Sequence, residues 1–295
     1  MRYAAIDTGS NAVRLLIADI IQNDGNITFK KNTLVRVPLR LGDDAFLDKH
    51  ISDKKADDLV KTMAAFKNLM DVYKVSDYMA CATSAMREAK NGPELIKRIK
   101  QEANLDLEII HGEVEAGIIY ASHIGVDLDE SKTYLYIDVG GGSTELSLFA
   151  NGEQIASQSF NIGTIRILDN QDKDETWREM QDFVRKHTKP YKIIYGVGTG
   201  GNINKLFKLS DEKDGEPLSY IKLKSLYNYL SSYSLKDRIN VLKLNQDRAD
   251  VIIPACEIYT TVMKWANIKS IYVPSVGMAD GIIQTLIEKN LLKKN

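Results

Sequence analysis

The feature that most constrains the fold of this chain is a strand–turn–strand pattern that occurs twice. In one copy, YLYIDVGGGSTELSLF (134–149), an apolar run ends at Asp138, breaks into three consecutive glycines and then resumes. In the other, YAAIDTGSNAVRLLIADI (3–20), Asp7 ends the first run and small residues form the turn. Glycine destabilises a strand and offers no side chain for packing. The pattern therefore predicts a backbone turn that approaches a ligand too closely for a Cβ atom, with an ordinary hairpin turn as the alternative.

The two aspartates occupy the same place in the two copies, and each copy is followed by a turn and a third strand-like run, 27–37 and 155–160. A repeat of this kind predicts two related halves, and the shared position of the acid favours it over coincidence. Strand-like and helical patterns mix in both halves, which indicates an α/β protein.

The type of connection limits which phosphate-binding folds are compatible. A Walker A loop and a dinucleotide fingerprint both lead from a strand into a helix, whereas these two turns lead from strand to strand. The segment GVGTGG (196–201) does fit G-x-G-x-x-G between a strand and a helix. However, the region that should supply the acidic strand about 20 residues later is polar and contains Pro217. We therefore expect an anion-binding turn there and no NAD site.

Bulk composition allows an enzyme and excludes some partners. The 295 residues suggest two domains, which we place at 1–126 and 127–295 because DLDESK (127–132) is a polar boundary; as an alternative, the last helix packs back on the first domain. A net charge of −1 gives no basic field for nucleic acid or an anionic membrane, and no apolar run approaches a membrane span. The two cysteines form no spacing motif, so we expect a reducing cytoplasm.

Several motifs, in order along nearly the whole chain, resemble the exopolyphosphatase / guanosine pentaphosphate phosphohydrolase (Ppx/GppA) family of the actin, Hsp70 and sugar-kinase superfamily. The segments that carry the resemblance are AIDTGSN (5–11), ATSAMREAKN (82–91), GEVEA (112–116), IDVGGGSTE (137–145), IGTIRI (162–167), GTGGN (198–202) and RADVIIPA (248–255). The chain departs from the family pattern at Val114, at Asn202 and in GMADG (277–281), which lacks an arginine. Its length is similar to that of the short family members, so we expect no additional C-terminal helical domains.

The resemblance implies two actin-like (ribonuclease H-like) domains with a cleft between them, and it assigns catalytic roles. Glu115 matches the position of the family's catalytic base, although a carboxylate in the first turn of a helix is also simply stabilising; His111 is a weaker alternative base. Acids beside a phosphate chain make sense mainly with Mg²⁺, so Asp7, Asp138 and Glu145 are the expected metal ligands. Turn-capping is the alternative role for the two aspartates.

Arg87 is the expected phosphate clamp, because its planar fork can hold two oxygens, with a salt bridge to Glu88 or Glu94 as the alternative. Arg166 is a weaker candidate of the same kind. The remaining residues expected to bind phosphate are turn glycines and short polar side chains, although Ser and Thr in such turns often only cap backbone. They are Gly9, Ser10, Asn11, Thr83, Ser84, Gly140, Gly141, Gly142, Ser143, Thr144, Gly198, Thr199, Gly200 and Gly201, with Asp7 beside them.

Together these residues predict Mg²⁺-dependent release of terminal orthophosphate from inorganic polyphosphate. Hydrolysis of guanosine pentaphosphate would use the same machinery, and the sequence does not separate the two substrates. An ATP-dependent sugar kinase or chaperone-type ATPase is disfavoured by the short length and by GEVEA. A phosphate or nucleotide sensor of weak activity is compatible with Val114 and Asn202, and the retained Glu115 argues against it. The family likeness is compatible with a homodimer, which the composition does not decide.

Overall fold

The computed structural model describes residues 1–23, 26–121, 129 and 131–292, and the chain divides into two compact units. The first contains residues 1–125 and 277–295, and the second contains residues 126–276. The sequence-based boundary after residue 126 nearly coincides with the observed one. Residues 277–295, which the main prediction gave to the second domain, belong instead to the first unit, as in the alternative where the last helix packs back.

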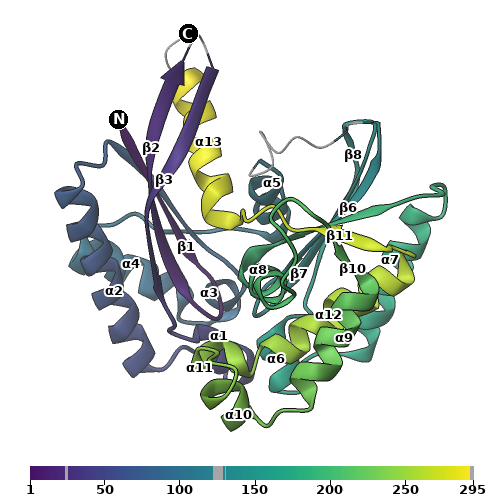
Figure 1. Ribbon diagram of the computed structural model, residues 1–295. Coiled ribbons are helices and arrows are strands. Elements are labelled where there is room, and N and C mark those ends of the chain that lie inside the picture. Colours follow the sequence, from purple (N-terminus) through teal and green to yellow (C-terminus); the bar gives the residue numbers. More distant parts are fainter. Residues whose placement is uncertain (24–25, 122–128, 130, 293–295) are drawn as a thin grey trace. The chain divides into compact units, whose positions relative to one another are not determined.

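The first unit is built on a five-stranded mixed sheet in the order β3-β2-β1-β4-β5 (Figure 1). β1 pairs antiparallel with β2 and parallel with β4. The strand is buried from Tyr3 to Asp7 because helices cover both faces of the sheet. The last helix, α13, packs on the face that carries Tyr3 and Ala5, and α2 and α4 lie on the opposite side. The elements are β1 (Arg2–Thr8), β2 (Val13–Asn23), β3 (Asn26–Val37), α1 (Leu41–Leu47), α2 (Asp53–Val72), β4 (Asp77–Ala82), α3 (Ser84–Glu88), α4 (Gly92–Ala103), β5 (Glu108–Ile109), α5 (Gly112–Ala121) and α13 (Met278–Leu292).

The second unit is built on a six-stranded sheet in the order β10-β11-β9-β6-β7-β8. Here β6 pairs antiparallel with β7 and parallel with β9, and α7, α8, α9 and α12 contribute to one large apolar core with the strands. The elements are β6 (Thr133–Val139), β7 (Thr144–Ala150), β8 (Glu153–Phe160), α6 (Thr164–Leu168), α7 (Asp174–Thr188), β9 (Tyr195–Thr199), α8 (Gly200–Leu209), β10 (Leu218–Ser219), α9 (Tyr220–Ser231), α10 (Leu235–Asn240), α11 (Gln246–Ala249), α12 (Ile252–Trp265) and β11 (Ser270–Tyr272).

The two units repeat one topology. The order β3-β2-β1-β4-β5 of the first sheet corresponds strand by strand to β8-β7-β6-β9-β11 of the second, with the same parallel and antiparallel pairs around the central strand. The two sheets also carry an irregularity at the same place, because the pairing register shifts after Ile17 in the first and after Leu148 in the second. This offset along the chain equals the one between Asp7 and Asp138. The predicted repeat is therefore a repeat of structure.

The local elements agree with the sequence patterns that predicted them. Toward the C-terminal end of the second unit, α11 and α12 follow each other closely, and Pro254 lies in the first turn of α12, where its missing N–H is not needed. GVGTGG does lead from a strand, β9, into a helix, α8. Residues 127, 128 and 130 of the predicted boundary segment lie outside the described residues.

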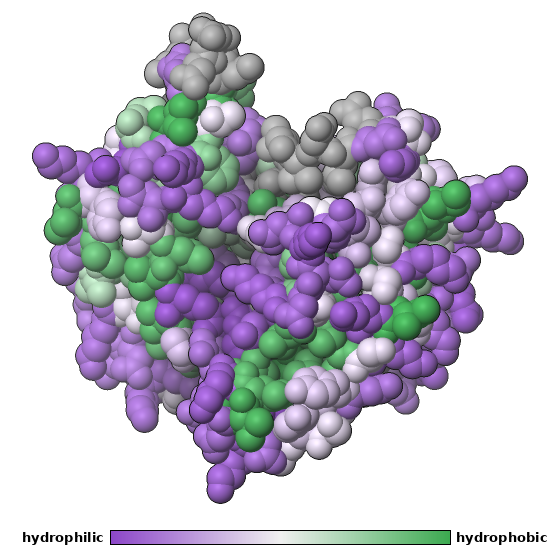
Figure 2. Space-filling view, in the orientation of Figure 1, coloured by the Kyte–Doolittle hydropathy of each residue, from purple (hydrophilic) through white to green (hydrophobic). Residues whose placement is uncertain are grey.

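The surface has a mixed character. On the face shown in Figure 2, hydrophilic side chains are interspersed with smaller apolar areas, in keeping with a charged content of 27%. In the part of the chain that the structure describes, no helix has the length and apolar character needed to cross a membrane.

Candidate functional site

The first small-residue turn joins β1 to β2 and is braced by the start of α1. Gly9 donates its N–H to the carbonyl of Ala12 at 3.2 Å, which closes the turn. Residues Arg40 and Gly42 donate their N–H groups to the carbonyls of Asn11 and Ser10, at 3.0 and 2.9 Å. The turn carbonyls are thus bonded to the protein, and the conformation of the turn is fixed by a segment that follows the whole β2–β3 hairpin in sequence.

The second turn joins β6 to β7 and is braced in the same manner by the start of α6. Gly140 donates to the carbonyl of Ser143 at 2.9 Å, and Thr164 and Ile165 donate to the carbonyls of Gly140 and Gly141 at 3.0 and 2.8 Å. The backbone at Gly163 lies very close to the turn, since a Cβ atom on Gly163 would lie 2.4 Å from the Gly141 carbonyl oxygen. Because the turn carbonyls face α6, an anion would meet the N–H edge of the turn.

Two predicted phosphate ligands of the second unit support this turn. Arg166 is 5% exposed, and its Nε donates to the carbonyl of Gly142 at 2.5 Å. Thr144 is fully buried, and its hydroxyl donates to the carbonyl of Ile162 at 2.7 Å. The latter contact matches the capping alternative for a turn threonine. Both side chains therefore hold the backbone of the turn in place.

Asp138 and Glu145 lie directly opposite each other on β6 and β7, so their carboxylates project from the same face of the sheet. Each is oriented by a hydroxyl: Thr199 donates to Oδ2 of Asp138 at 2.8 Å, and Ser159 donates to Oε1 of Glu145 at 2.7 Å. Two adjacent, oriented carboxylates are a donor set that suits Mg²⁺, which is commonly held by one or two carboxylates and several waters.

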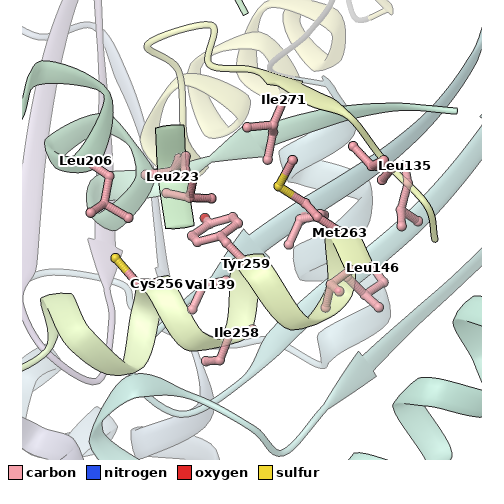
Figure 3. Close-up of a cluster of buried hydrophobic side chains, with 14 of the residues drawn as sticks. Leu135, Val139, Leu146, Leu206, Leu223, Cys256, Ile258, Tyr259, Met263 and Ile271 are labelled. Atoms are coloured by element: carbon pink, nitrogen blue, oxygen red, sulfur yellow. The ribbon is translucent and has the colours of Figure 1, made fainter. Parts of the chain in front are cut away.

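The core beneath this pair is largely apolar, and Tyr259 lies within it. Figure 3 shows Tyr259 of α12 among apolar side chains that include Val139 and Leu223. Its hydroxyl donates to the carbonyl of Thr199 at 3.0 Å. Burial, and then the negative charge of Asp138, raise the pKa of Tyr259 well above its ordinary value. Tyr259 is thus a neutral donor that supports the residue bonded to Asp138.

The predicted third metal ligand, Asp7, has a different environment. It lies opposite Arg14 on β1 and β2 and forms an ion pair with it. Within the described ranges 1–23, 26–121, 129 and 131–292, no group of three or more His, Cys, Asp or Glu side chains is arranged to hold a metal ion. The structure therefore brings Asp138 and Glu145 together and places Asp7 with a cation. A metal site at the second turn would rest on two carboxylates.

The candidate base, Glu115, lies in the first turn of α5 and is 8% exposed. Nη1 of Arg87 is 3.8 Å from Oε2 of Glu115 and donates to the carbonyl of Ile110 at 2.7 Å. The alternative partner Glu88 pairs instead with Lys49 at 2.9 Å. The predicted clamp and the predicted base are thus neighbours in the first unit.

The segment that leads to Arg87 also contacts the first turn. The hydroxyls of Ser84 and Ser10 are 2.8 Å apart, and the N–H of Thr83 donates to the carbonyl of Thr8 at 3.2 Å. Cys81 lies in β4 itself; burial, and then the negative charges of Asp7, Glu108 and Glu115, raise the pKa of its thiol to about 12. The first unit therefore gathers its turn, Arg87 and Glu115 around the carboxyl ends of β1 and β4.

The third glycine segment, Gly198–Gly201, is shaped by close contacts. Gly200 has a φ of +85°, and a Cβ atom there would lie 2.7 Å from Oδ1 of Asp138. On Gly201, a Cβ atom would lie 2.8 Å from the guanidinium of Arg248, which donates to the Gly201 carbonyl at 2.6 Å. Arg248 belongs to the RADVIIPA segment, but the sequence patterns assigned it no role. Its place in that family motif was the one signal that could have pointed to it.

Two repeated α/β units, each with a braced small-residue turn after its central strand, define a two-domain actin-like protein. Comparison with known families is specific: the model described as the Ppx/GppA phosphatase family matches residues 22–290. This chain therefore belongs to the Ppx/GppA phosphatase family, which confirms the resemblance predicted from its motifs.

Individual relatives agree with this membership. The chain is 29% identical over 277 residues to the bifunctional 3-dehydroquinate synthase/phosphatase of Fusobacterium nucleatum, a match that covers 85% of this chain and 41% of that protein. It is 23% identical over 303 residues to exopolyphosphatase 1 of Mycobacterium tuberculosis, covering 96% and 87%. The crystal structure of an exopolyphosphatase from Cytophaga hutchinsonii matches with a TM-score of 0.84, 25% identity and 98% coverage of both chains. The chain thus spans less than half of the Fusobacterium protein and most of the other two.

Proposed function

We propose that this protein is an exopolyphosphatase that removes the terminal orthophosphate from inorganic polyphosphate. The observation that supports the proposal most is the buried Glu115 beside Arg87, in a member of a phosphatase family. A carboxylate and a guanidinium at this distance can act on one phosphoryl group, with the carboxylate toward the attacking water and the cation toward the oxygens.

In the proposed reaction, a water oxygen attacks the terminal phosphorus, and the bond from that phosphorus to the bridging oxygen breaks. Glu115 accepts the proton of the water, and the products are orthophosphate and a chain shorter by one phosphate. Arg87 holds the oxygens of the transferred group, and the N–H edge of each turn offers donors to phosphate oxygens. Asp138 and Glu145 would hold Mg²⁺, which when bound neutralises phosphate charge.

The test is phosphate release by the purified protein from long-chain polyphosphate, guanosine pentaphosphate and ATP in parallel, each with Mg²⁺ and with EDTA. Glu115→Gln should lower kcat by about 10²- to 10⁴-fold, as expected for loss of a general base. Glu113→Gln is the matched control, because Glu113 is exposed in the same helical turn. Preferred release from guanosine pentaphosphate would select the alternative substrate. Binding of all three compounds without phosphate release would favour the alternative function, a phosphate or nucleotide sensor.

Three further expectations belong to this proposal: a location in the cytoplasm, a homodimer, and no nucleic-acid or membrane partner. They are supported by the net charge of −1, by the two buried free cysteines and by the family likeness. Light scattering after size exclusion tests the dimer, and a single peak at 33.1 kDa would contradict it.

A further inference from the structure

The helix that carries Glu115 is seated against the last helix of the chain at one glycine. α5 and α13 pack together within the first unit. A Cβ atom on Gly281 of α13 would lie 1.9 Å from the carbonyl oxygen of Ile118 and 2.9 Å from its Cγ2. Real Cβ atoms essentially never come within 3.0 Å of another group, and the atom met here is backbone. The two helices can keep their present distance only with glycine at position 281.

The contact lies one turn from the candidate base. Ile118 follows Glu115 by three residues, so the two lie on neighbouring turns of the same helical face. Both are buried, at 6% and 8% exposure. A hydrogen-bonded helix moves as a unit over such a distance, about 4.5 Å along its axis. A shift of the Ile118 carbonyl is therefore transmitted to Glu115.

The first turn of α13 is itself held in place by contacts that do not involve α5. Oδ1 of Asp280 is 2.6 Å from Nζ of Lys31 on β3, and Oδ2 accepts the N–H of Gly277 at 3.0 Å. Asp280 is 6% exposed, and the next residues of α13, Ile282 and Ile283, are fully buried. Because these contacts hold the first turn of α13, we expect an added atom at position 281 to displace α5.

We propose that Gly281 is a positioning residue that sets the location of Glu115 through the Ile118 carbonyl. A methyl group at position 281 requires the helices to separate by about 1 Å, from 1.9 to 3.0 Å. A misplacement of this size at a reacting group costs about 10²-fold in rate. The inference rests on Glu115 being the base of the proposed function. It adds that α13, through Gly281, sets the position of this base.

The experiment compares Gly281→Ala with two controls by kcat and KM for polyphosphate, corrected for the folded fraction. Gly117→Ala lies on α5 itself, where a Cβ atom meets nothing within 4 Å. Leu286→Ala removes a side chain of α13 that is 2% exposed, so it lowers stability without an atom at the contact. We expect Gly281→Ala to lower kcat about 10²-fold with KM nearly unchanged, and both controls to retain kcat within about threefold.

A double-mutant cycle tests whether Gly281 acts through Glu115. If it does, Glu115→Gln combined with Gly281→Ala is no slower than Glu115→Gln alone. The inference is overturned if the losses of kcat in the two single variants add in the double variant. It is also overturned if the kcat of Gly281→Ala stays within about threefold of the wild type, or if Leu286→Ala loses as much kcat as Gly281→Ala. An inactive wild type, or a fully active Glu115→Gln, would instead overturn the proposed function.

A second variant keeps the inference testable if Gly281→Ala does not fold. Lys31→Met removes the cation that holds Asp280 and adds nothing at the helix contact, and Lys30→Met on the neighbouring position of β3 is its control. A several-fold lower kcat at unchanged KM in Lys31→Met, absent from Lys30→Met, supports the positioning role. Equal kcat in the two variants overturns it.

Discussion

Arg14 and Glu145 occupy the same position in the two repeated hairpins and give the two turns different charge. Arg14 lies opposite Asp7 and forms an ion pair with it. Glu145 lies opposite Asp138 and places a second carboxylate there. The repeat therefore preserves backbone geometry while the charge differs: one turn carries a neutral pair and the other an acidic pair. Such a carboxylate pair would suit a cation such as Mg²⁺ better than the neutral pair at the first turn does.

The ion pair at the first turn should contribute to stability. Arg14→Met would leave the carboxylate of Asp7, which is 3% exposed, without its cation. Removing one partner of a buried pair costs about 3–5 kcal/mol, and the partial exposure of Arg14 reduces this to about 2 kcal/mol. Urea denaturation measures the loss. The double variant with Asp7→Asn should recover most of the lost free energy of unfolding. An Arg14→Met protein as stable as the wild type would show that the ion pair does not contribute to stability.

The acidic pair at the second turn should depend on its hydroxyl donors. Ser159→Ala removes the donor to Glu145, and loss of such an orienting partner typically costs about 10- to 100-fold in metal affinity. Ser157→Ala is the matched control, because Ser157 lies two residues earlier on β8 and bonds to Ser147. Titration with Mn²⁺, monitored by electron paramagnetic resonance, measures affinity without turnover. Equal affinities in the two variants would exclude an orienting role for Ser159.

Much of this architecture could be predicted from sequence because it depends on local patterns. The strand–turn–strand repeat is set by residues close to each other in the chain, and its prediction was confirmed. The repeated aspartates correctly indicated two related halves. Their metal role stays a prediction, and the sequence patterns did not reveal that Arg14 forms an ion pair with Asp7.

The remaining features depend on contacts between distant segments. Arg248 meets Gly201, and Gly281 meets Ile118, although each pair is far apart in sequence. No periodicity or spacing reports such a contact, since it exists only after the sheets and helices have assembled. For the same reason the sequence did not reveal that Arg166 donates to the Gly142 carbonyl; its phosphate role stays a prediction.

Gly200 should be irreplaceable for a reason that Gly215 does not share. Both have a left-handed φ, +85° and +89°, so alanine at either position costs about 1 kcal/mol of stability. At Gly200 a Cβ atom would also lie 2.7 Å from Oδ1 of Asp138, whereas at Gly215 it meets nothing within 4 Å. Gly200→Ala should therefore weaken Mn²⁺ binding and phosphate release, and Gly215→Ala should lower only stability. Equal metal affinity in the two variants would contradict this assignment.

The two buried thiols should make the fold sensitive to alkaline pH. Burial raises the pKa of Cys256 to about 12, and burial together with nearby carboxylates does the same for Cys81. Their unfolded pKa is 9.0. The folded state therefore holds its thiol protons more tightly, and each thiol's contribution to stability is complete below pH 9 and is lost as the pH rises toward 12. The loss of stability approaches about 1.4 kcal/mol per pH unit for each thiol.

Urea denaturation of the wild type and Cys256→Ala at pH 8, 9 and 10 measures this loss. The stability of the wild type should fall more steeply above pH 9 than that of the variant. Parallel pH profiles would show that Cys256 ionises equally in both states.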